Sequence, residues 1–241
     1  TGAYTHRFVV LSRNLTFDSS WDTILVLDEE PGATVDTTPI STFLQALPQL
    51  TTSPLPEPRT EQIHDLATTI QAASLRPPEH YTSAEIIPLG LTGGDEPFPL
   101  PGRATRMVAI SPFLDRSLID RLPRSRERTL VSRPETLDRL GSKALEGWTT
   151  ATLARTAERP PDQHDGSGPA DGASPHYDGE DHDAAAPQER DRVRDGLHAK
   201  TVVADVTGGS LTLTGSANLT SPAWGGNVEL SVLMRGSRRH T

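Results

Sequence analysis

Four polar side chains near the end of the chain have the types and the spacing that phosphate chemistry needs. His198 and Lys200 lie two residues apart, and Ser216 and Asn218 repeat that spacing in the next apolar segment. Side chains two residues apart on a strand leave the same face, so we expect all four to converge over an apolar sheet. Lysine, amide and hydroxyl groups donate hydrogen bonds to phosphate oxygens, and histidine can attack phosphorus or protonate a leaving oxygen. The pattern therefore predicts a phosphate site.

Two carboxylates accompany this set. Asp205 completes the pattern His-x-Lys-x4-Asp and is counted with the catalytic residues. Its odd spacing from His198 nevertheless predicts that it faces the other way and pins the hairpin. Glu229 is a candidate partner for one ring nitrogen of His198, where it would fix the tautomer, or else an ordinary solvated strand residue. The structural alternative for the whole set is a hairpin with surface polar residues, which the number of matching positions disfavours.

Composition limits the possible functions. The chain has 241 residues, enough to bury a core, and no cysteine, which excludes disulfides, a thiol nucleophile and Cys-ligated zinc. The net charge of −9 would argue against nucleic acid as a partner, but residues 156–196 hold most of the acidic excess. Histidines within that segment are irregularly spaced, so we expect no metal and no other cofactor. No apolar stretch is long enough for a membrane span, and a cytoplasmic location fits the sequence.

Apolar segments must position the candidate site. Short runs rich in β-branched residues predict buried strands at 7–12, 23–28, 107–111, 128–132, 148–154 and 227–234, and a hairpin of 197–206 with 210–218 turned at 207–209. Apolar spacing, Pro and Gly predict helices at 60–74 (capped by Thr60), 112–122 (starting at Pro112) and 133–141. The alternation of strands and helices predicts an α/β fold, a layered sheet with helices on its faces.

An internal repeat links the two ends of the chain. SRNLT at 12–16 matches the GSANLT string at a constant offset of 204 residues, which places Ser12 on Ser216 and Asn14 on Asn218. Each copy follows an apolar strand and precedes a tryptophan-containing loop and another strand. Five shared letters can arise by chance, but the shared flanking pattern favours duplication.

The strings HAKTVVAD, GSANLT and NVEL together resemble the phospholipase D superfamily and its HxK(x4)D(x6)GSxN signature. One departure is the nine residues that separate Asp205 from Gly215, where six are usual. An extended turn over 207–210 would explain the difference. The resemblance is specific over 197–235 and moderate over 107–155 and 7–28.

The resemblance implies a phospholipase D-like layered α-β-α sandwich, with one complete second repeat and the tail of a first repeat. Residues 1–35 would then be the end of the first repeat, and 36–104 a partly helical, Pro-rich connection between the repeats. Residues 105–241 would be the second repeat, with a disordered acidic insertion at about 156–196.

The resemblance also implies two such motifs at one metal-free phosphodiesterase site, where one histidine forms phosphohistidine and the other acts as acid and then base. His198 would be the general acid, with Lys200 and Asn218 binding the phosphate. Ser12 and Asn14 would be the surviving phosphate ligands of the first motif, with Arg13 adding charge. The nucleophilic histidine would lie upstream of Thr1 in an N-terminally truncated chain, since no histidine of the given sequence occupies its position. This fragment is then expected to be inactive alone.

The preferred substrate is a nucleic acid, because SRNLT followed by SWD is similar to tyrosyl-DNA phosphodiesterase-like and nuclease-like members. A phospholipid phosphodiesterase or transphosphatidylase is the alternative within the family, and a non-catalytic phosphate-binding module is the alternative outside enzymes. Trp21 and Trp224 could stack a base or pack against the interface between the two lobes.

Overall fold

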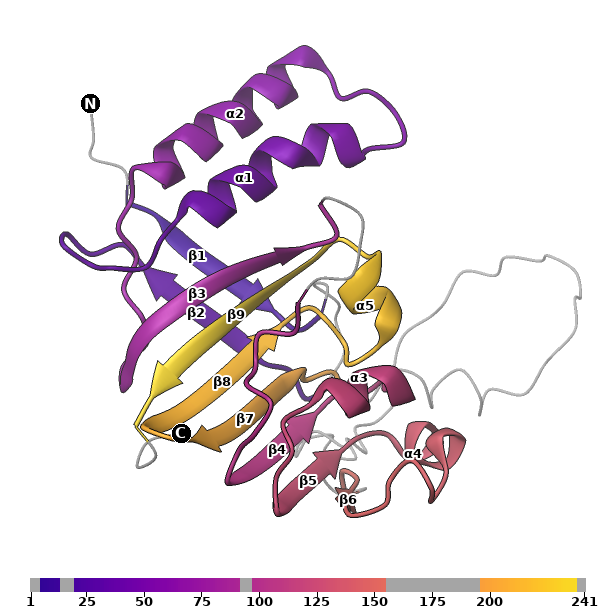
Figure 1. The fold of residues 1–241 in the computed structure, drawn as a ribbon. Helices are drawn as coiled ribbons and strands as arrows, with labels where there is room; N and C mark the ends of the chain where they lie inside the picture. Colours follow the sequence, from indigo (N-terminus) through magenta and orange to yellow (C-terminus); the bar gives the residue numbers. More distant parts are fainter. Residues whose placement is uncertain (1–4, 14–19, 92–96, 155–195, 238–241) are drawn as a thin grey trace, which may run out of the picture.

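The computed structural model describes residues 5–13, 20–91, 97–154 and 196–237 (Figure 1). These residues form a two-stranded sheet, a seven-stranded mixed sheet and several short helices, which confirms the α/β class. The predicted acidic insertion lies, apart from Gly196, outside the described residues, as does Asn14.

The seven-stranded sheet is built from strands that begin at residue 81 and has the order β3-β9-β8-β7-β4-β5-β6. β4 pairs in parallel with β5, and β5 with β6, whereas every other neighbouring pair is antiparallel. The strands are β3 (Tyr81–Leu89), β4 (Arg106–Ile110), β5 (Glu127–Val131), β6 (Thr149–Ala151), β7 (Thr201–Val206), β8 (Gly209–Gly215) and β9 (Glu229–Gly236). All the strands predicted between 107 and 234 are present, but β6 is shorter than predicted and exposed along its length.

The first two predicted strands form a separate antiparallel pair. β1 (Arg7–Leu11) pairs with β2 (Ile24–Asp28), with Val9 opposite Val26. Buried and exposed residues alternate along both strands. The expectation that both strands are buried is therefore wrong, because one face of the pair is exposed. Ile24 is 65% exposed while its neighbour Leu25 is 7% exposed, the pattern of a sheet covered on one side.

Three elements between residues 31 and 101 were not predicted: α1 (Thr38–Ala46), a short 3-10 helix and β3. The helix α1 packs beside α2 (Glu57–Gln71), which begins before the predicted Thr60 because Pro58 stands in its first turn. The edge strand β3 contains Pro88, which lacks an N–H and is tolerated because only β9 pairs with β3. A short 3-10 helix (Leu47–Leu50) follows α1.

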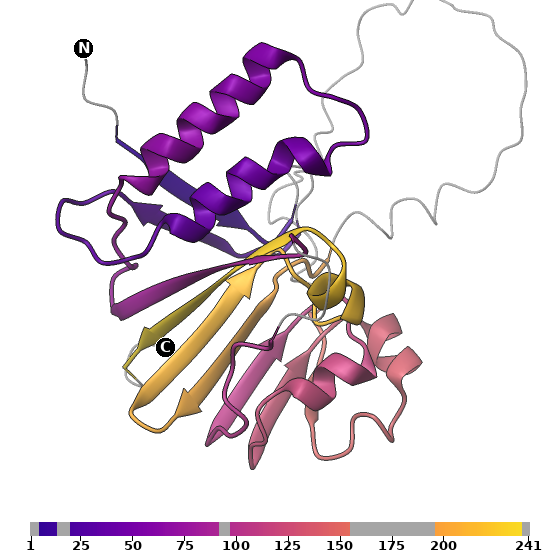
Figure 2. The same cartoon turned by 45° about the horizontal axis from the view of Figure 1, so that its top comes forward.

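The large sheet has a core on each side. Alternate side chains of β9 point to opposite cores. Val232 and Met234 belong to the core that includes residues of β1, β2, α1 and α2, whereas Leu233 packs against the core that includes α3 (Arg116–Arg121). Figures 1 and 2 show α1 and α2 close to β1, β2 and β3, and α3 and α4 (Pro134–Leu140) at the β4–β5 end. This layering agrees with a sheet between two covering layers.

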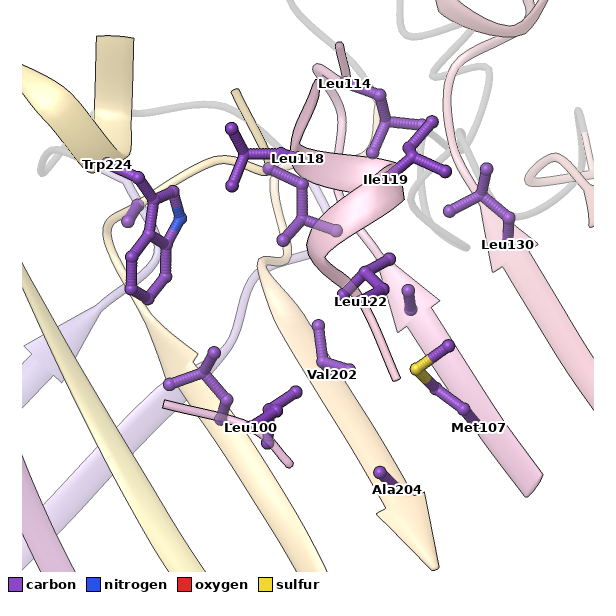
Figure 3. Close-up of a cluster of buried hydrophobic side chains, with 14 of the residues drawn as sticks. Leu100, Met107, Leu114, Leu118, Ile119, Leu122, Leu130, Val202, Ala204 and Trp224 are labelled. Atoms are coloured by element: carbon purple, nitrogen blue, oxygen red, sulfur yellow. The ribbon is translucent and has the colours of Figure 1, made fainter. Parts of the chain in front are cut away.

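The helix α3 closes the second core. Leu118, Ile119 and Leu122 face Met107 and Val202 on the sheet (Figure 3). The helix is shorter than the predicted 112–122, because Asp115 rather than Pro112 caps it by accepting a hydrogen bond from the Leu118 N–H at 3.0 Å. α4 matches its prediction and ends at Gly141, whose φ of 74° favours glycine.

The β7–β8 hairpin is tighter than predicted. Val206 pairs directly with Gly209, so the turn consists of Thr207 and Gly208 alone. The extended turn expected over 207–210 is therefore wrong, and the additional residues between Asp205 and Gly215 lie in the paired strand β8. Gly208 has a φ of 88°, in the left-handed region that glycine adopts without steric cost. No helix among the described residues is long and apolar enough to span a membrane.

Candidate functional site

The predicted phosphate ligands of the second half lie at adjoining strand ends. His198 and Lys200 come immediately before β7, and Ser216 and Asn218 come immediately after β8. The expectation that all four lie on strands is wrong, since the pairing ends between Thr201 and its partner Thr214. Because the two strands are antiparallel neighbours, these ends still meet at one edge of the sheet.

Lys200 joins the two halves of the site. Its Nζ donates to the carbonyl oxygen of Ser12 at 2.5 Å and to that of His198 at 3.0 Å. The side chain is only 8% exposed, and this burial lowers the pKa of the ammonium to about 8. Nearby carboxylates, Glu229 more than Asp22, act against that lowering. Lys200 is thus a largely buried cation held mainly by backbone carbonyls.

His198 is half-buried, and its ring meets an arginine. Its Nε2 lies 3.0 Å from Nη2 of Arg133. A guanidinium can only donate, so Nε2 accepts and the ring proton of the neutral imidazole is on Nδ1. Burial is the largest cause that lowers the pKa of His198, followed by the charges of Arg133 and Lys200. The imidazole is accordingly neutral at pH 7, with its Nε2 lone pair engaged.

Ser216 and Glu229 form a compact unit with the start of β9. The Oγ of Ser216 donates to Oε2 of Glu229 at 2.5 Å and accepts from the N–H of Leu230 at 3.0 Å, while the Ser216 N–H donates to the Leu230 carbonyl at 2.9 Å. Glu229 was expected either to contact the His198 ring or to be an ordinary solvated strand residue, and its carboxylate instead accepts a hydrogen bond from Ser216. Glu229 therefore orients Ser216 by a hydrogen bond and raises the pKa of Lys200 by its negative charge.

Ser12 forms the same unit with the start of β2. Its Oγ donates to Oδ1 of Asp22 at 3.3 Å and accepts from the N–H of Thr23 at 2.9 Å, while the Ser12 N–H donates to the Thr23 carbonyl at 3.0 Å. Asp22 also pairs with Nε of Arg13. The repeat seen in the letters of the sequence is thus also a repeat of hydrogen bonds, one copy on each side of Lys200.

Asn218 is oriented by the end of β4. Its Oδ1 accepts from Oγ of Ser111 at 3.5 Å, and its carbonyl oxygen accepts from the indole N–H of Trp224 at 3.1 Å. The same serine Oγ accepts from the N–H of Leu219 at 3.2 Å. Through Ser111 the strand β4 fixes the segment that follows β8. The counterpart in the first half, Asn14, lies outside the described residues.

Asp205 belongs to the motif in sequence but not to the site in space. It lies near the far end of β7, where it pairs with Ser210 across the hairpin. One carboxylate oxygen accepts from Nε of Arg106 at 2.5 Å, and the backbone carbonyl accepts from the N–H of Thr105 at 2.7 Å. The structure therefore separates Asp205 from His198, and its contacts are those of a residue that pins the hairpin to β4.

The two tryptophans of the repeat differ in their surroundings. Trp224 is 2% exposed and packs against Phe98 inside a hydrophobic core, with ring centroids 4.7 Å apart, rather than standing open to stack a base. Trp21 is 55% exposed, and its carbonyl oxygen accepts from the N–H groups of His198 at 2.8 Å and Ala199 at 2.7 Å. The exposed ring of Trp21 therefore belongs to a segment that is hydrogen-bonded directly to the histidine.

Two residues of the site were missed from the sequence. Asp22 could have been found by continuing the repeat. It lies ten positions after Ser12, however, whereas Glu229 lies thirteen positions after Ser216, so the constant offset hides the match. Arg133 comes from the segment before α4 and shows no pattern that marks it. Among the described residues, no group of three His, Cys, Asp or Glu side chains could hold a metal ion.

Comparisons with known proteins do not assign a family: no family model matches the chain, and no curated protein matches it. The function is therefore argued from the site alone.

Proposed function

We propose that the chain contributes to a phospholipase D-type phosphodiesterase site, in which His198 is the general acid and the phosphate lies against Lys200 and Asn218. The observation that carries the proposal is the pair of matching serine–carboxylate units around Ser12 and Ser216, with Lys200 between them. A pseudo-symmetric site of two halves suits a reaction with two histidines, one for each chemical role.

The proposed reaction has two steps. A second histidine attacks phosphorus, the bond from phosphorus to the leaving oxygen breaks, and His198 gives its proton to that oxygen. Water then attacks the phosphohistidine, His198 takes a proton from the water, and the phosphorus–nitrogen bond breaks to free the second histidine. That histidine would come from a first motif preceding Thr1 or from a second copy. A single copy of residues 1–241 is then expected to be inactive.

The preferred substrate class is nucleic acid rather than lipid. The exposed ring of Trp21 is attached to the segment that hydrogen-bonds His198, and a base could stack on it. Arg133 and Arg13 add positive charge near the same histidine. A flat ring beside cationic groups suits a nucleotide, whereas a lipid substrate would need an apolar surface for its chains.

A non-catalytic phosphate-binding module is the second candidate. The observation that favours it is the neutral His198, whose Nε2 accepts from Arg133 rather than carrying an acidic proton. Such a site would bind phosphate through Lys200 and Arg133 without turnover. It would retain phosphate binding after His198 is replaced by an amide side chain.

The test is hydrolysis of a single-stranded DNA oligonucleotide and of phosphatidylcholine vesicles by the full-length protein. We expect His198→Asn to lower kcat on the preferred substrate by about 10²- to 10⁴-fold, the contribution of a positioned acid–base group. His64→Asn is the matched control, because His64 is exposed on α2. Acid-quenched samples should contain a phosphohistidine. Full activity of His198→Asn would contradict the mechanism, and phosphate binding without any turnover would favour the binding module.

A further inference from the structure

We propose that Arg133 is an anion-binding residue of this site, which turns from Nε2 of His198 to an oxygen of the substrate phosphate and so releases Nε2 for proton uptake. The inference deepens the proposed function, and it rests on that function for the identity of the anion as a phosphodiester.

The guanidinium of Arg133 is anchored through Nε, while its Nη2 is placed where it can exchange one hydrogen-bond acceptor for another. Nε of Arg133 donates to the carbonyl oxygen of Leu197 at 3.1 Å, and the group lies over the ring of Phe113 at 5.0 Å from the centroid. These contacts fix the position of the guanidinium beside His198. Nη2 is the nitrogen that reaches the histidine, at 3.0 Å from Nε2. A small rotation about this anchored edge can therefore move Nη2 from the ring to a nearby oxyanion.

The local charge favours an anion. Among the described residues, neither Arg133 nor Lys200 has a carboxylate at ion-pair distance, in contrast to Arg13, which pairs with Asp22. The partners of the first two cations are backbone carbonyls and an imidazole. Burial lowers the pKa of both cationic groups, which shows that their charge is poorly solvated. Glu135 acts on Arg133, and Glu229 and Asp22 act on Lys200, only from beyond ion-pair distance. A phosphate oxygen would place negative charge at hydrogen-bonding distance, and arginine matches it with two donors.

Anion binding must then act on His198. The charges of Arg133, Lys200 and Arg13 all lower the pKa of the histidine beyond the effect of burial, whereas Asp22 raises it. A phosphodiester placed between these cations offsets their charge, and the turn of Arg133 frees the nitrogen that must take the proton. Both effects raise the pKa of His198. Substrate binding would thus help to protonate the general acid that the proposed reaction needs.

A purely structural role for Arg133 makes a different prediction. If the residue only ties α4 to the segment around Leu197, its replacement would lower stability and, by removing a nearby positive charge, raise the pKa of His198. It would then change neither the anion affinity nor the shift of that pKa on anion binding. The variants Arg133→Lys and Arg133→Gln separate these cases, because lysine keeps the charge while glutamine keeps only a hydrogen-bonding side chain. Arg139→Gln is the control, since Arg139 is exposed on α4.

The experiment follows the His198 ring nitrogens by ¹H–¹⁵N NMR in the full-length protein while dimethyl phosphate, a monoanion across the pH range used, is titrated in. For the wild type and Arg139→Gln we expect saturable binding and an upward shift of the His198 pKa. For Arg133→Gln we expect affinity at least about tenfold weaker, the worth of a charged hydrogen bond. In Arg133→Gln the pKa of His198 should be higher than in the wild type before the anion is added, and it should rise less when the anion binds. Arg133→Lys should fall between the two.

The outcomes separate this inference from the proposed function. Wild-type anion affinity, together with a wild-type shift of the His198 pKa on anion binding, in folded Arg133→Gln would overturn the role of Arg133. Failure of the wild type to bind dimethyl phosphate at His198 would overturn it as well. Absence of turnover would contradict only the enzymatic proposal, because binding and titration are measured without any reaction.

Discussion

The segments around Ser12 and Ser216 make the same hydrogen bonds in different surroundings. In both, a serine Oγ donates to a carboxylate and accepts from the N–H of the residue after it; that carboxylate is the first residue of β9 in one unit and lies two residues before β2 in the other. β8, which leads to Ser216, is buried along its whole length, whereas β1, which leads to Ser12, alternates between buried and exposed residues. Local hydrogen bonding therefore follows from the serine and the carboxylate, while burial follows from what packs around the strand.

The residue before each serine shows the difference most sharply. A Cβ added to Gly215 would lie 2.3 Å from the carbonyl oxygen of Leu230, too close for any side chain. At the corresponding position of the first unit the chain has Leu11, which is only half-buried. The second copy is thus packed against β9 tightly enough to require glycine, and the first is not.

The largest expected effect comes from this contact. Gly215→Ala should lower the free energy of unfolding by about 3 kcal/mol, because backbone atoms of β9 must move to admit the methyl group. Leu11→Ala should cost only about 1 kcal/mol, since a half-buried side chain loses less contact. Chemical denaturation of both variants measures the difference. Gly102→Ala is the control, with nothing within 4 Å of the added Cβ, and equal losses in all three would contradict the comparison.

A smaller effect should distinguish Glu229 from Asp22 by how far each one raises the pKa of Lys200. The pKa of this ammonium is about 8, so its charge, and with it part of the affinity for dimethyl phosphate, is present below that pH and lost as the pH rises through it. Affinity should therefore fall by up to about tenfold between pH 7 and pH 9. Glu229 raises this pKa more than Asp22 does, so Glu229→Gln should move the loss to lower pH than Asp22→Asn.

The control for that titration is Lys200→Arg, which stays charged throughout and should hold its affinity to pH 9. Identical midpoints for the two carboxylate variants would show that the two halves act equally on Lys200. A wild-type affinity independent of pH would show that Lys200 does not carry the anion.

The smallest effect concerns the exposed face of the first pair of strands. Ile24→Thr should change the free energy of unfolding by no more than about 0.5 kcal/mol, because Ile24 is 65% exposed. Leu25→Ala, one residue away on the buried face, should cost about 3 kcal/mol. Thermal and chemical unfolding measure both. A large loss from Ile24→Thr would mean that this face is covered in solution.

The sequence predicts the strands better than the helices for a physical reason. β1, β2, β4, β5, β7, β8 and β9 are short runs of β-branched and aliphatic residues, so local composition indicates them. β3 mixes polar residues with Pro88, and it is a strand because β9 provides its partner. α1 likewise depends on packing against α2 and β3, which no local pattern of this chain reveals.

The candidate site divides in the same way. His198, Lys200, Ser216 and Asn218 come from one hairpin, so their spacing predicts that they meet. Arg133 joins the histidine from a segment 65 residues away, through contacts that depend on the folded sheet. Asp205 was counted with the site because it completes the motif, although its odd spacing from His198 predicted a role in pinning the hairpin. The length of β7 carries it to the other end of the strand, where its contacts fit that second prediction.

The most direct test of the proposed phosphate site is a crystal structure of the protein with tungstate, a tetrahedral oxyanion located by its anomalous scattering. The account predicts tungstate within hydrogen-bonding distance of Lys200 Nζ and beside His198, with Arg133 turned from the ring to an anion oxygen. Tungstate bound elsewhere, for example at Arg106 beside Asp205, with the His198–Lys200 site empty and Arg133 unmoved, would contradict it.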